Sequence, residues 1–426
     1  MNVLLVGSGA REHAIAWKLR QSPKLTDLFV APGNAGTASL GANLDIAASD
    51  VEGLTRAARD ERCELVVVGP EDPLSRGLVD RLAVEGIAAF GPSLAAARIE
   101  SSKSFAKELM RTHGIPTAAY ATFDNRTDAL NYVDSLRDPP VVKADGLAAG
   151  KGSIVCDSKE EAVQAIEAMM GSAAVFGESG STVVIEERMS GREVSAHAFT
   201  DGRTTVPMPF SCDYKRARDG DEGLNTGGMG AYSPPGWLDS DTAGRIDEEI
   251  TRAAVAAMMS EEAPYRGVLY PGVMITADGP RVVEFNARLG DPEAQVLLPR
   301  LKTDLLEICL AVAENRLHEM EIQWSDEACV AVVVASGGYP DEYQTGFPIA
   351  GLGAVEEDAL VFHAGTAFGE DGSVVTSGGR VLTVAALGAT LSEARAKAYR
   401  NVQRIHFSNR HYRRDIAAPA QEARVE

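Results

Sequence analysis

The first 92 or so residues alternate short apolar runs with stretches that repeat at helical period. The runs occupy residues 3–6, 28–30, 64–68 and 87–90, and each leads directly into a glycine or proline turn. Continuous apolar strands separated by helices are typical of a parallel sheet that is covered on both faces. Ligands bind such sheets beyond the carboxyl ends of the strands, so we expect the four turns to gather at one binding edge.

The pattern changes along the rest of the chain. A helical stretch runs from about residue 93 to 113, and residues 120–186 give strands, glycine turns and one helix at 158–170. That segment is small enough to form an independent lid. Residues 187–322 carry further strands and amphipathic helices. The last block begins near residue 328 with an apolar run, and its polar tail, 419–426, is expected to fray.

Composition narrows the class of protein. A chain of 426 residues, 45% of them hydrophobic, predicts about two to four globular domains. A net charge of −20 argues against nucleic-acid binding, because phosphate backbones demand a basic face. No apolar run reaches the roughly 18 residues that cross a bilayer, and no signal segment precedes the first glycine turn. The five cysteines are scattered, so we expect reduced thiols in a cytoplasmic protein without membrane partners.

Lysine is scarce, since only ten of the 41 basic residues are lysine. An acidic, lysine-poor surface suits a salt-rich cytoplasm, where charge repulsion is screened. A GC-rich genome that favours arginine codons would give the same composition. Four lysines nevertheless fall inside motifs: Lys103, Lys143, Lys151 and Lys215. Because an ammonium group is a compact point charge that suits a phosphate oxygen, these four are candidates for a phosphate site.

The first glycine turn, GSGAREH from Gly7, is close to a dinucleotide-binding fingerprint but has Glu12 where the third glycine belongs. The acidic residue that would bind the ribose is also missing from the end of the second strand, which runs into APGN from Ala31. A nicotinamide dehydrogenase is therefore disfavoured. The turn still predicts bare N–H groups at a helix start, which favour a phosphorylated substrate over a purely structural turn.

Two segments point to phosphoryl transfer. The loop GLAAGKG, residues 146–152, fails as a P-loop because it is one residue too short and ends in Gly152 where Ser or Thr should stand. A glycine hairpin that closes over phosphates remains. The later strand that ends at Asn286 places Glu284 on the same face, followed by Arg288. Mg²⁺ often takes only one or two such oxygen ligands beside phosphate oxygens, so lysines and this clamp together predict a phosphoryl-transfer site.

Two further segments are interpreted from the motifs that lie near them in the sequence. Residues 185–189, IEERM, lie between the glycine loop and the clamp and fit a hinge that reads adenine through backbone groups, although their acids could simply be solvated. The loop NTGGMGAYSP from Asn225, with the charged flank DYKR from Asp213, favours function over disorder. The seven histidines show no zinc-type spacing, so a zinc site is not expected.

These residues resemble the phosphoribosylamine–glycine ligases, also called glycinamide ribonucleotide synthetases, over nearly the whole chain. The glycine hairpin and the Glu284–Asn286 clamp are features of ATP-grasp enzymes in general. The stretches that point to this one family are NTGGMGAYSP from Asn225, GDPE from Gly290 and the N-terminal loops VGSGAREHA from Val6, APGNAG from Ala31 and GPE from Gly69. The resemblance continues near the C-terminus through SGGYP from Ser336 and SGGR from Ser377.

The resemblance implies an α/β and α+β multidomain fold. It has an N-terminal doubly wound parallel sheet, a two-subdomain ATP-grasp core and a small C-terminal α+β domain. The periodicity fits this division with a substrate domain at 1–100, the metal-site subdomain at 101–120 and 187–325, the lid subdomain at 121–186 and the C-terminal domain at 326–426. The implied reaction joins glycine to 5-phosphoribosylamine through a glycyl phosphate, with ATP and Mg²⁺ or Mn²⁺, in a cytoplasmic monomer of purine biosynthesis.

The resemblance also implies roles for individual residues. The expected catalytic side chains are Lys143, Asp213 and Arg288, and the expected metal ligands are Glu284 and Asn286. ATP is expected to contact Lys103, Lys143, Gly146, Gly150, Lys151, Gly152, Glu186, Glu187, Met189 and Glu193. Glycine and 5-phosphoribosylamine are expected to contact Gly7, Gly9, Arg11, Gly33, Asn34, Pro70, Glu71, Asp213, Lys215, Asn225, Thr226, Gly227, Gly228, Arg288, Gly290 and Asp291.

The sequence departs from the family pattern at two places, and two other functions are alternatives to this interpretation. Arg188 lies in the hinge where relatives often carry an aromatic residue, and the strand 268–276 offers no further metal ligand. Another ATP-grasp ligase, such as a biotin-type or purine-type carboxylase, would use bicarbonate instead of glycine. A non-catalytic nucleotide sensor would not need Lys143, Glu284, Asn286 and Arg288 together.

Overall fold

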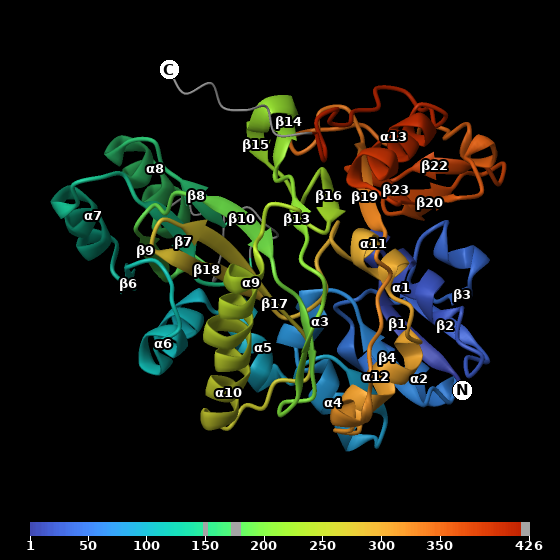
Figure 1. The fold of residues 1–426 in the computed structure, drawn as a ribbon, viewed down its shortest axis with the longest axis horizontal. Helices are drawn as coiled ribbons and strands as arrows, with labels where there is room; N and C mark the ends of the chain where they lie inside the picture. The colour runs from blue at the N-terminus through green and yellow to red at the C-terminus, as the bar shows by residue number, and fades with distance from the viewer. Residues whose placement is uncertain (148–151, 172–179, 419–426) are drawn as a thin grey trace.

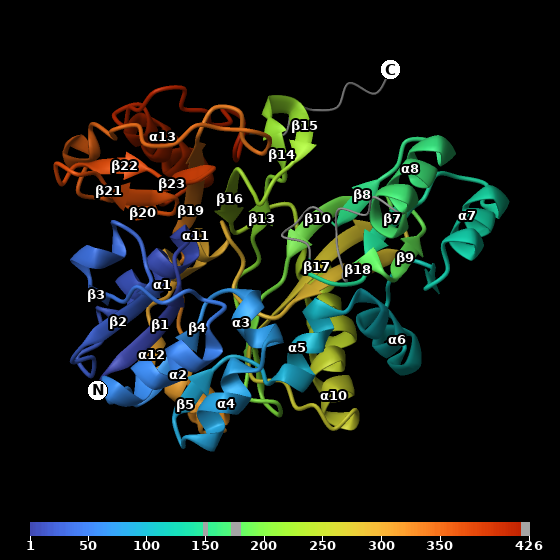
Figure 2. The ribbon, with the colours of Figure 1, turned by 180° about the vertical axis from the view of Figure 1, so that it is seen from behind.

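The computed structural model describes residues 1–147, 152–171 and 180–418. Figures 1 and 2 show four regions of the molecule from opposite sides. The N-terminal region, in blue, and the C-terminal region, in red, are stacked on one side. The lid region, in teal, lies on the other side, and the core lies between them. One parallel sheet and several antiparallel sheets are present, so the expected α/β and α+β multidomain class is confirmed. Among the described residues, no helix is long and apolar enough to cross a membrane.

The N-terminal region is a parallel sheet in the order β3-β2-β1-β4-β5. Its strands are β1 (Val3–Gly7), β2 (Leu28–Pro32), β3 (Ala42–Asn43), β4 (Leu65–Val68) and β5 (Ala88–Phe90). Its helical segments are α1 (Ala10–Leu19), η1 (Thr37–Ser39), α2 (Val51–Asp60), α3 (Glu71–Ser75) and α4 (Leu78–Val84). Four strands coincide with the predicted apolar runs.

These runs are apolar throughout because both faces of the sheet are buried. Leu4 and Val6 belong to the same hydrophobic cluster as Leu54 of α2, whereas Leu5 belongs with Ile15 of α1 on the other face. β1 lies between β2 and β4, so the chain leaves it in opposite directions, and the turns after β1 and β4 meet at the topological switch point.

The predicted helical stretch at 93–113 is two helices, α5 (Leu94–Ser101) and α6 (Lys103–His113). Ser102 has extended backbone angles, and its hydroxyl accepts a hydrogen bond from the N–H of Phe105 at 3.2 Å. The carboxylate of Asp145 accepts from the N–H of Ser104 at 2.5 Å. Capping from the side chains therefore starts a second helix where the apolar pattern alone suggested continuity.

The lid region is an antiparallel sheet in the order β6-β9-β7-β8, with two helices packed on it. Its elements are β6 (Tyr120–Phe123), α7 (Arg126–Ser135), β7 (Val141–Ala144), β8 (Ser153–Val155), α8 (Lys159–Met170) and β9 (Val183–Glu186). The hydroxyl of Ser158 caps α8, which agrees with the predicted helix. Its buried side chains form a hydrophobic cluster of their own, separate from the two clusters that hold the rest of the protein.

The core sheet has the order β10-β17-β11-β12, with β18 paired to β17. Its strands are β10 (Arg192–Ser195), β11 (Ala198–Thr200), β12 (Thr205–Pro207), β17 (Gly267–Thr276) and β18 (Gly279–Asn286). The helical segments of this region are α9 (Ser240–Arg245), η4 (Ile246–Arg252), α10 (Ala253–Ser260), α11 (Ala294–Leu297), η5 (Leu298–Arg300), α12 (Leu305–Ala313) and η6 (Leu317–Glu319). The predicted strands 268–270 and 273–276 are one strand, β17, with a register shift between Gly272 and Val273.

The C-terminal sheet has the order β13-β16-β19-β23-β20. Its strands are β13 (Cys212–Asp213), β16 (Gly230–Ser233), β19 (Ala328–Ala335), β20 (Ala359–His363) and β23 (Arg380–Gly388). Around it lie η3 (Asp219–Asp221), η7 (Leu352–Ala354), α13 (Leu391–Val402) and the hairpins β14 (Arg216–Arg218) with β15 (Glu222–Asn225) and β21 (Thr366–Phe368) with β22 (Val374–Thr376). Because β13 and β16 precede residue 326, this sheet crosses the expected domain boundary there.

Candidate active site

A buried lysine pair surrounds one carboxylate where the lid sheet meets the core. Lys143 of β7 lies 3.0 Å from Glu186 Oε1 and donates to the carbonyl of Val283 at 2.9 Å. Lys107 of α6 lies 3.1 Å from Glu186 Oε2. Burial lowers the pKa of Lys107 to about 8, against the opposing effect of Glu186. The sequence reasoning missed Lys107, although it follows Lys103 by four residues and so shares its helix face.

The residues expected at adenine and the ribose lie nearby with partners of their own. Glu186 is 3% exposed and lies within ion-pair distance of both lysines, although its Oε1 accepts no hydrogen bond from the described residues, whereas Glu187 is paired with Arg281 at 3.4 Å on the surface. Met189 is half-buried, and Glu193 forms an ion pair with Lys215. The Glu186 carboxylate thus orients Lys143 in this structure, and only the backbone of the hinge is left to meet a base.

The start of the glycine loop lies beside the first residue of α6. Lys103 donates to the carbonyl of Gly146 at 3.2 Å, and burial lowers the pKa of its ammonium. The carbonyl of Gly152 accepts from the N–H of Ala144 at 2.8 Å, which closes the hairpin. Gly150 and Lys151 lie outside the described residues.

Glu284 and Asn286, the expected metal ligands, lie on one face of β18. Burial raises the pKa of Glu284, but the cations of Lys215, Lys143, Lys103 and Arg288 outweigh burial and hold the pKa below its ordinary value. The Asn286 amide donates to the carbonyl of Tyr270 at 3.4 Å, which leaves its oxygen as the ligand atom.

This clamp fits Mg²⁺ bound together with phosphates. In the described part of the chain, no group of three or more His, Cys, Asp or Glu side chains is arranged to hold a metal by itself. One carboxylate and one amide oxygen are hard ligands, and Mg²⁺ commonly completes such a set with phosphate oxygens and water.

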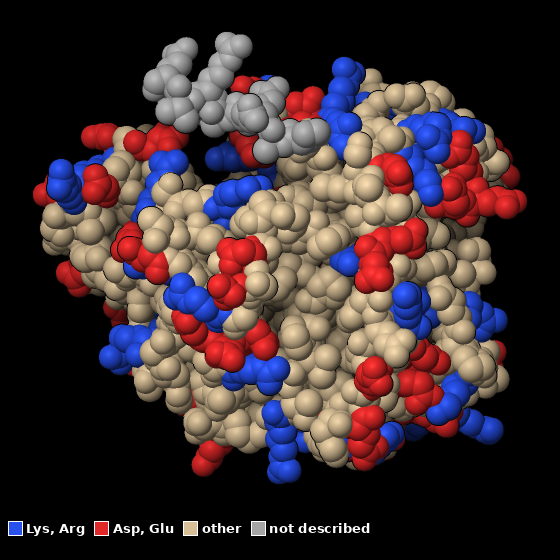
Figure 3. Space-filling view, viewed as in Figure 1, with Lys and Arg blue, Asp and Glu red and all other residues tan. Residues whose placement is uncertain are grey.

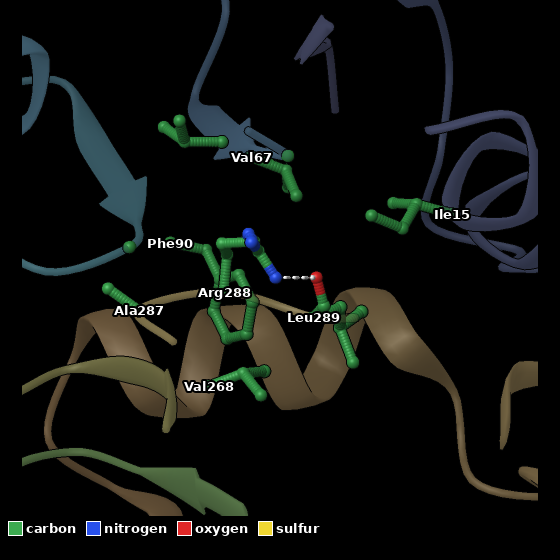
Figure 4. A pocket seen from close by; sticks show the side chains of 10 residues that line it. Ile15, Val67, Phe90, Val268, Ala287, Arg288 and Leu289 are labelled. Carbon is green, nitrogen blue, oxygen red and sulfur yellow. Dashed lines mark hydrogen bonds between the residues drawn. The ribbon is translucent and has the colours of Figure 1, made fainter. Parts of the chain in front are cut away.

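Arg288 bridges two carboxylates from the N-terminal half of the chain. Its Nε lies 3.1 Å from Glu71, and a terminal nitrogen lies 2.9 Å from Glu100. Figure 4 shows its guanidinium beside Val67 and Phe90 of the parallel sheet, with a further hydrogen bond to the Leu289 carbonyl at 3.4 Å. The substrate edge of the sheet is therefore joined to the metal strand through one side chain.

The pKa values of the two carboxylates that share Arg288 are shifted in opposite directions. Burial raises the pKa of Glu71, but the guanidinium groups of Arg288 and Arg11 outweigh it and hold the pKa at about 2. Burial raises the pKa of Glu100 to about 7, assisted by the negative charge of Glu71 and opposed by Arg288. Glu100 was not expected at the site, because it lies within a helix without any motif around it.

The expectation of bare N–H groups at the first turn is wrong for Gly9, because its N–H is bound by the side chain of Glu12. Its carboxylate accepts from the N–H of Gly9 at 2.6 Å and from Arg11 Nε at 2.6 Å. A Cβ on Gly7 or Gly69 would lie within 2.5 Å of the Glu12 side chain, so these glycines give it room at the switch point. Glu12, which replaces the third glycine of the fingerprint, therefore occupies the space in which a dinucleotide would bind. Its carboxylate already accepts the hydrogen bond of the Gly9 N–H.

The second turn is held rigid by Asn34. Its amide nitrogen donates to the carbonyls of Ser8 and His363, each at 2.8 Å, and its oxygen accepts from the N–H groups of Gly36 and Thr37. The side chain has no hydrogen-bonding capacity left for a ligand, so its contribution to the site is the shape of the loop. Gly33 precedes it with φ +72, and Pro70 begins the third turn directly before Glu71.

The predicted substrate loops meet the metal strand around Lys215. Burial raises the pKa of Asp213 to about 7, against the opposing ammonium of Lys215. Burial lowers the pKa of Lys215, but Glu193, Asp213 and Glu284 outweigh burial and raise it. Thr226 donates through its N–H and its hydroxyl to the carbonyl of Lys215, at 2.7 and 2.9 Å.

A buried polar layer supports the loop that carries Gly290 and Asp291. The N–H of Gly290 donates to His197 Nε2 at 3.3 Å, and the His197 ring stacks on Tyr270 with centroids 4.0 Å apart. The Tyr270 hydroxyl donates to Glu293 at 2.6 Å. Asp291 itself is paired with Arg380 of β23 at 3.0 Å. Arg380 was noted only within the SGGR stretch, and its role was not foreseen.

The charges on the face seen in Figure 3 are interspersed, with acidic and basic side chains side by side. Cations at the site come instead from buried positions, Lys107 and Lys143, and from half-buried ones, Lys103, Lys215 and Arg288. A parallel sheet, an antiparallel hairpin with a Glu-x-Asn pair, Lys143 on a separate lid sheet and two further lysines on α6 are typical of a nucleotide-dependent phosphoryl-transfer enzyme of the ATP-grasp class.

Comparison with known proteins identifies the family. The chain matches the phosphoribosylglycinamide synthetase N domain at residues 1–100, the ATP-grasp (A) domain at 101–294 and the C domain at 329–419. The chain therefore belongs to the phosphoribosylglycinamide synthetase family, as the resemblance implied.

Related proteins match this sequence over nearly its whole length. The phosphoribosylamine–glycine ligase of Allochromatium vinosum is 50% identical, with 98% of both chains covered, and that of Halalkalibacterium halodurans is 47% identical over 99% of this chain and 97% of its own. A trifunctional purine biosynthetic protein of Gallus gallus is 51% identical over 97% of this chain, which spans only 42% of that protein.

Two solved structures match the fold of this chain over nearly its whole length. The crystal structure of a phosphoribosylamine–glycine ligase from Thermotoga maritima has a TM-score of 0.86 at 36% identity, over 98% of this chain and all of that one. A biotin carboxylase from Campylobacter jejuni has a TM-score of 0.74 at 15% identity, over 98% and 94%, and shares the fold alone.

Proposed function

We propose that the protein joins glycine to 5-phosphoribosylamine through a glycyl phosphate, with ATP converted to ADP and phosphate. Family membership supports the ligase activity, and the convergence of Lys143, Glu284 and Arg288 on one site supports the route. A free carboxylate is a poor electrophile because its oxygen leaves badly. Transfer of the γ-phosphoryl group to glycine converts that oxygen into phosphate, a good leaving group.

The nucleotide would lie between the lid sheet and the core hairpin. Lys143, Lys103 and the N–H groups of the glycine loop would bind its phosphates, and the hinge after Glu186 would meet adenine. Mg²⁺ held by Glu284 and Asn286 would neutralise phosphate charge during transfer. Arg288 would bind the transferred group or the glycine carboxylate, because its guanidinium lies at the third turn of the parallel sheet, beside Glu71, and its charge acts on Glu284.

Glycine and the amine would lie on the opposite side of the clamp. Asp213 is expected to bind the glycine ammonium, which would replace the countercharge of Lys215 and favour the ionised carboxylate. The phosphoribosylamine would occupy the edge formed by the turns at Gly9, Gly33 and Pro70, near Glu71. Its amine then attacks the glycyl carbonyl, the C–O bond to phosphate breaks, and the amine loses a proton.

Glycine labelled with ¹⁸O in its carboxylate tests the route. One label is expected in inorganic phosphate, because the oxygen that accepts the phosphoryl group leaves with it, and the nucleotide product is expected to be ADP. Reactions that lack glycine, 5-phosphoribosylamine or both serve as controls. Unlabelled phosphate, or AMP with pyrophosphate, would rule out the glycyl phosphate. ADP release that needs bicarbonate instead of glycine would favour the carboxylase alternative.

We also propose that Mn²⁺ can replace Mg²⁺ and that the protein acts as a cytoplasmic monomer without nucleic-acid or membrane partners. Carboxylate and amide oxygens suit both metals. Each of the five cysteines is buried and unpaired, which supports a reducing compartment. Metal titration of the apo protein and its mass in solution, measured with and without ATP, test these points.

A further inference from the structure

Arg380 joins two substrate loops to the C-terminal sheet. One terminal nitrogen of its guanidinium donates to the carbonyls of Gly227, of Gly228 at 3.5 Å and of Asp291 at 2.7 Å. The other terminal nitrogen lies 3.0 Å from the Asp291 carboxylate. A planar fork with several fixed donors can hold this set of acceptors at once, whereas a lysine ammonium cannot reach them in the same geometry.

The sequence of the glycine loop fits this contact. A Cβ on Gly227 would lie 3.1 Å from the guanidinium carbon of Arg380, and the φ of Gly227 is not positive. The missing side chain at Gly227 is therefore explained by the approach of Arg380 and not by backbone conformation. Gly228 differs, because its φ is +107 and a Cβ there would also meet Pro292.

The same contacts reach the first turn of the parallel sheet. A Cβ on Gly9 would lie 3.3 Å from the Asp291 carboxylate, whose other oxygen accepts from Gln295 at 2.7 Å. Asp291 is thus fixed from two sides and presented to the N-terminal turn. Segments from the N-terminal sheet, the core and the C-terminal sheet meet at this carboxylate.

We infer that Arg380 is a positioning residue for the substrate site: it sets the Gly227–Gly228 loop and Asp291 against the N-terminal turn, and does not act on the nucleotide. The inference rests on the proposed function, because it assumes that these loops bind glycine and 5-phosphoribosylamine. Arg380 lies on β23, and its hydrogen bonds within the described part of the chain go to Gly227, Gly228 and Asp291, so its removal is expected to separate the two sides of the reaction.

The test compares Arg380→Ala and Arg380→Lys with Arg395→Ala. Arg395 is the matched control, because it also donates to backbone carbonyls of the C-terminal region, those of Ile416 at 2.9 Å and Arg414 at 2.6 Å. We expect Arg380→Ala to lower kcat/KM for glycine and 5-phosphoribosylamine by roughly 10- to 100-fold, while KM for ATP stays within about twofold. Arg380→Lys should recover little, because it restores the charge without the fork.

A double-mutant cycle with Gly227→Ala adds a second criterion. The added methyl group should impair the enzyme that carries Arg380 but add little to the loss in Arg380→Ala, because the atoms that it meets are gone. Equal increases in all three KM values, losses matched by Arg395→Ala, full recovery in Arg380→Lys, or additive losses with Gly227→Ala would overturn the inference.

Amide hydrogen exchange separates this inference from the proposed function. Without substrates, exchange at residues 225–229 and 290–293 should rise in Arg380→Ala and stay unchanged in Arg395→Ala. A wild-type protein without glycine-dependent ADP release would overturn the proposed function alone. Unchanged exchange at both loops would overturn the positioning role, whatever the activity.

Discussion

The nucleotide side and the substrate side of this site use different cations. Lysines face the expected phosphates: Lys103, Lys107 and Lys143. Arginines hold the substrate edge, where Arg11 pairs with Glu12, Arg288 with Glu71 and Glu100, and Arg380 with Asp291. In a chain with ten lysines, three of them on one side of a single site is a strong local concentration.

The difference follows from the chemistry of the two groups. An ammonium on a flexible stem can exchange one oxygen partner for another, so Lys143 can leave Glu186 when a phosphate arrives. A guanidinium fork fits two acceptors at fixed geometry and serves as a brace. We therefore expect the nucleotide side to use cations that change partners and the substrate side to use cations that hold loops together.

The largest effect is expected for Glu284→Gln, which removes the anion that faces three of the lysines. An amide is a weaker hard ligand than a carboxylate, and a bound metal ion supplies several kcal/mol of charge stabilisation. Turnover should fall by about 1,000-fold or more, measured as glycine-dependent ADP release, with an unchanged melting profile. Asp278→Asn, on the exposed turn of the same hairpin, should keep normal turnover. Near-normal turnover in Glu284→Gln would remove the metal clamp from the site.

Arg288→Lys tests the bracing side. A lysine keeps the charge but cannot reach Glu71 and Glu100 together, so kcat/KM should fall roughly 100-fold, or about 2.7 kcal/mol. The control is Arg281→Lys on the same strand, whose partners Glu187 and Asp278 are on the surface. If both variants kept wild-type kinetics, the fork at Arg288 would have no role that an ammonium cannot fill.

The local elements could be predicted because their signals are local. The strands of the parallel sheet are apolar throughout, and α8 begins at a serine cap, so both were found. The break at Ser102 was missed because the helical pattern continues on both sides of this serine cap, and the second capping group, Asp145, comes from another part of the chain. The C-terminal sheet was divided at residue 326 because strand pairing between Gly230 and Val332 leaves no mark in either segment.

The site was predicted in part for the same reason. Glu284, Asn286 and Arg288 share one strand end and were found together, whereas Glu100 reaches Arg288 across 188 positions of sequence. Lys107 and Arg380 depend on tertiary contacts with Glu186 and Asp291. Side chains whose role is to hold another side chain carry no motif, because their spacing from the partner is set by the fold and not by the helix or strand period.

The Glu100→Gln variant tests whether Glu100 is protonated beside Arg288 while Glu71 is ionised. A raised pKa, from 4.5 to about 7, means stability that is complete below about pH 4.5 and is lost as pH rises through about 7. Glutamine mimics the protonated acid and lacks this loss. From about pH 5 to about pH 8 the wild type should therefore lose on the order of 1–3 kcal/mol relative to Glu100→Gln, measured by denaturant unfolding.

Glu71→Gln is the matched control for this measurement. The pKa of Glu71 is lowered to about 2, so its stability is present above about pH 4.5 and is lost only as pH falls through about 2. The difference between the wild type and Glu71→Gln should therefore stay constant from about pH 5 to about pH 8. A constant difference for Glu100→Gln as well would show that both carboxylates are ionised beside Arg288.

The smallest effect is expected for Lys107→Met, and it tests whether the lysines exchange partners. Glu186 now divides its charge between Lys107 and Lys143, so loss of Lys107 should strengthen the remaining pair and hold Lys143 away from phosphate. KM for ATP should rise about tenfold, or about 1.4 kcal/mol, with little change in KM for glycine. Lys159→Met, on the lid surface, is the control. The double variant Lys107→Met with Glu186→Gln should recover part of the loss, because the neutral amide releases Lys143. A double variant no better than Lys107→Met would mean that Lys143 does not leave Glu186 when the nucleotide binds, and the contrast between exchanging lysines and bracing arginines would fail at its central residue.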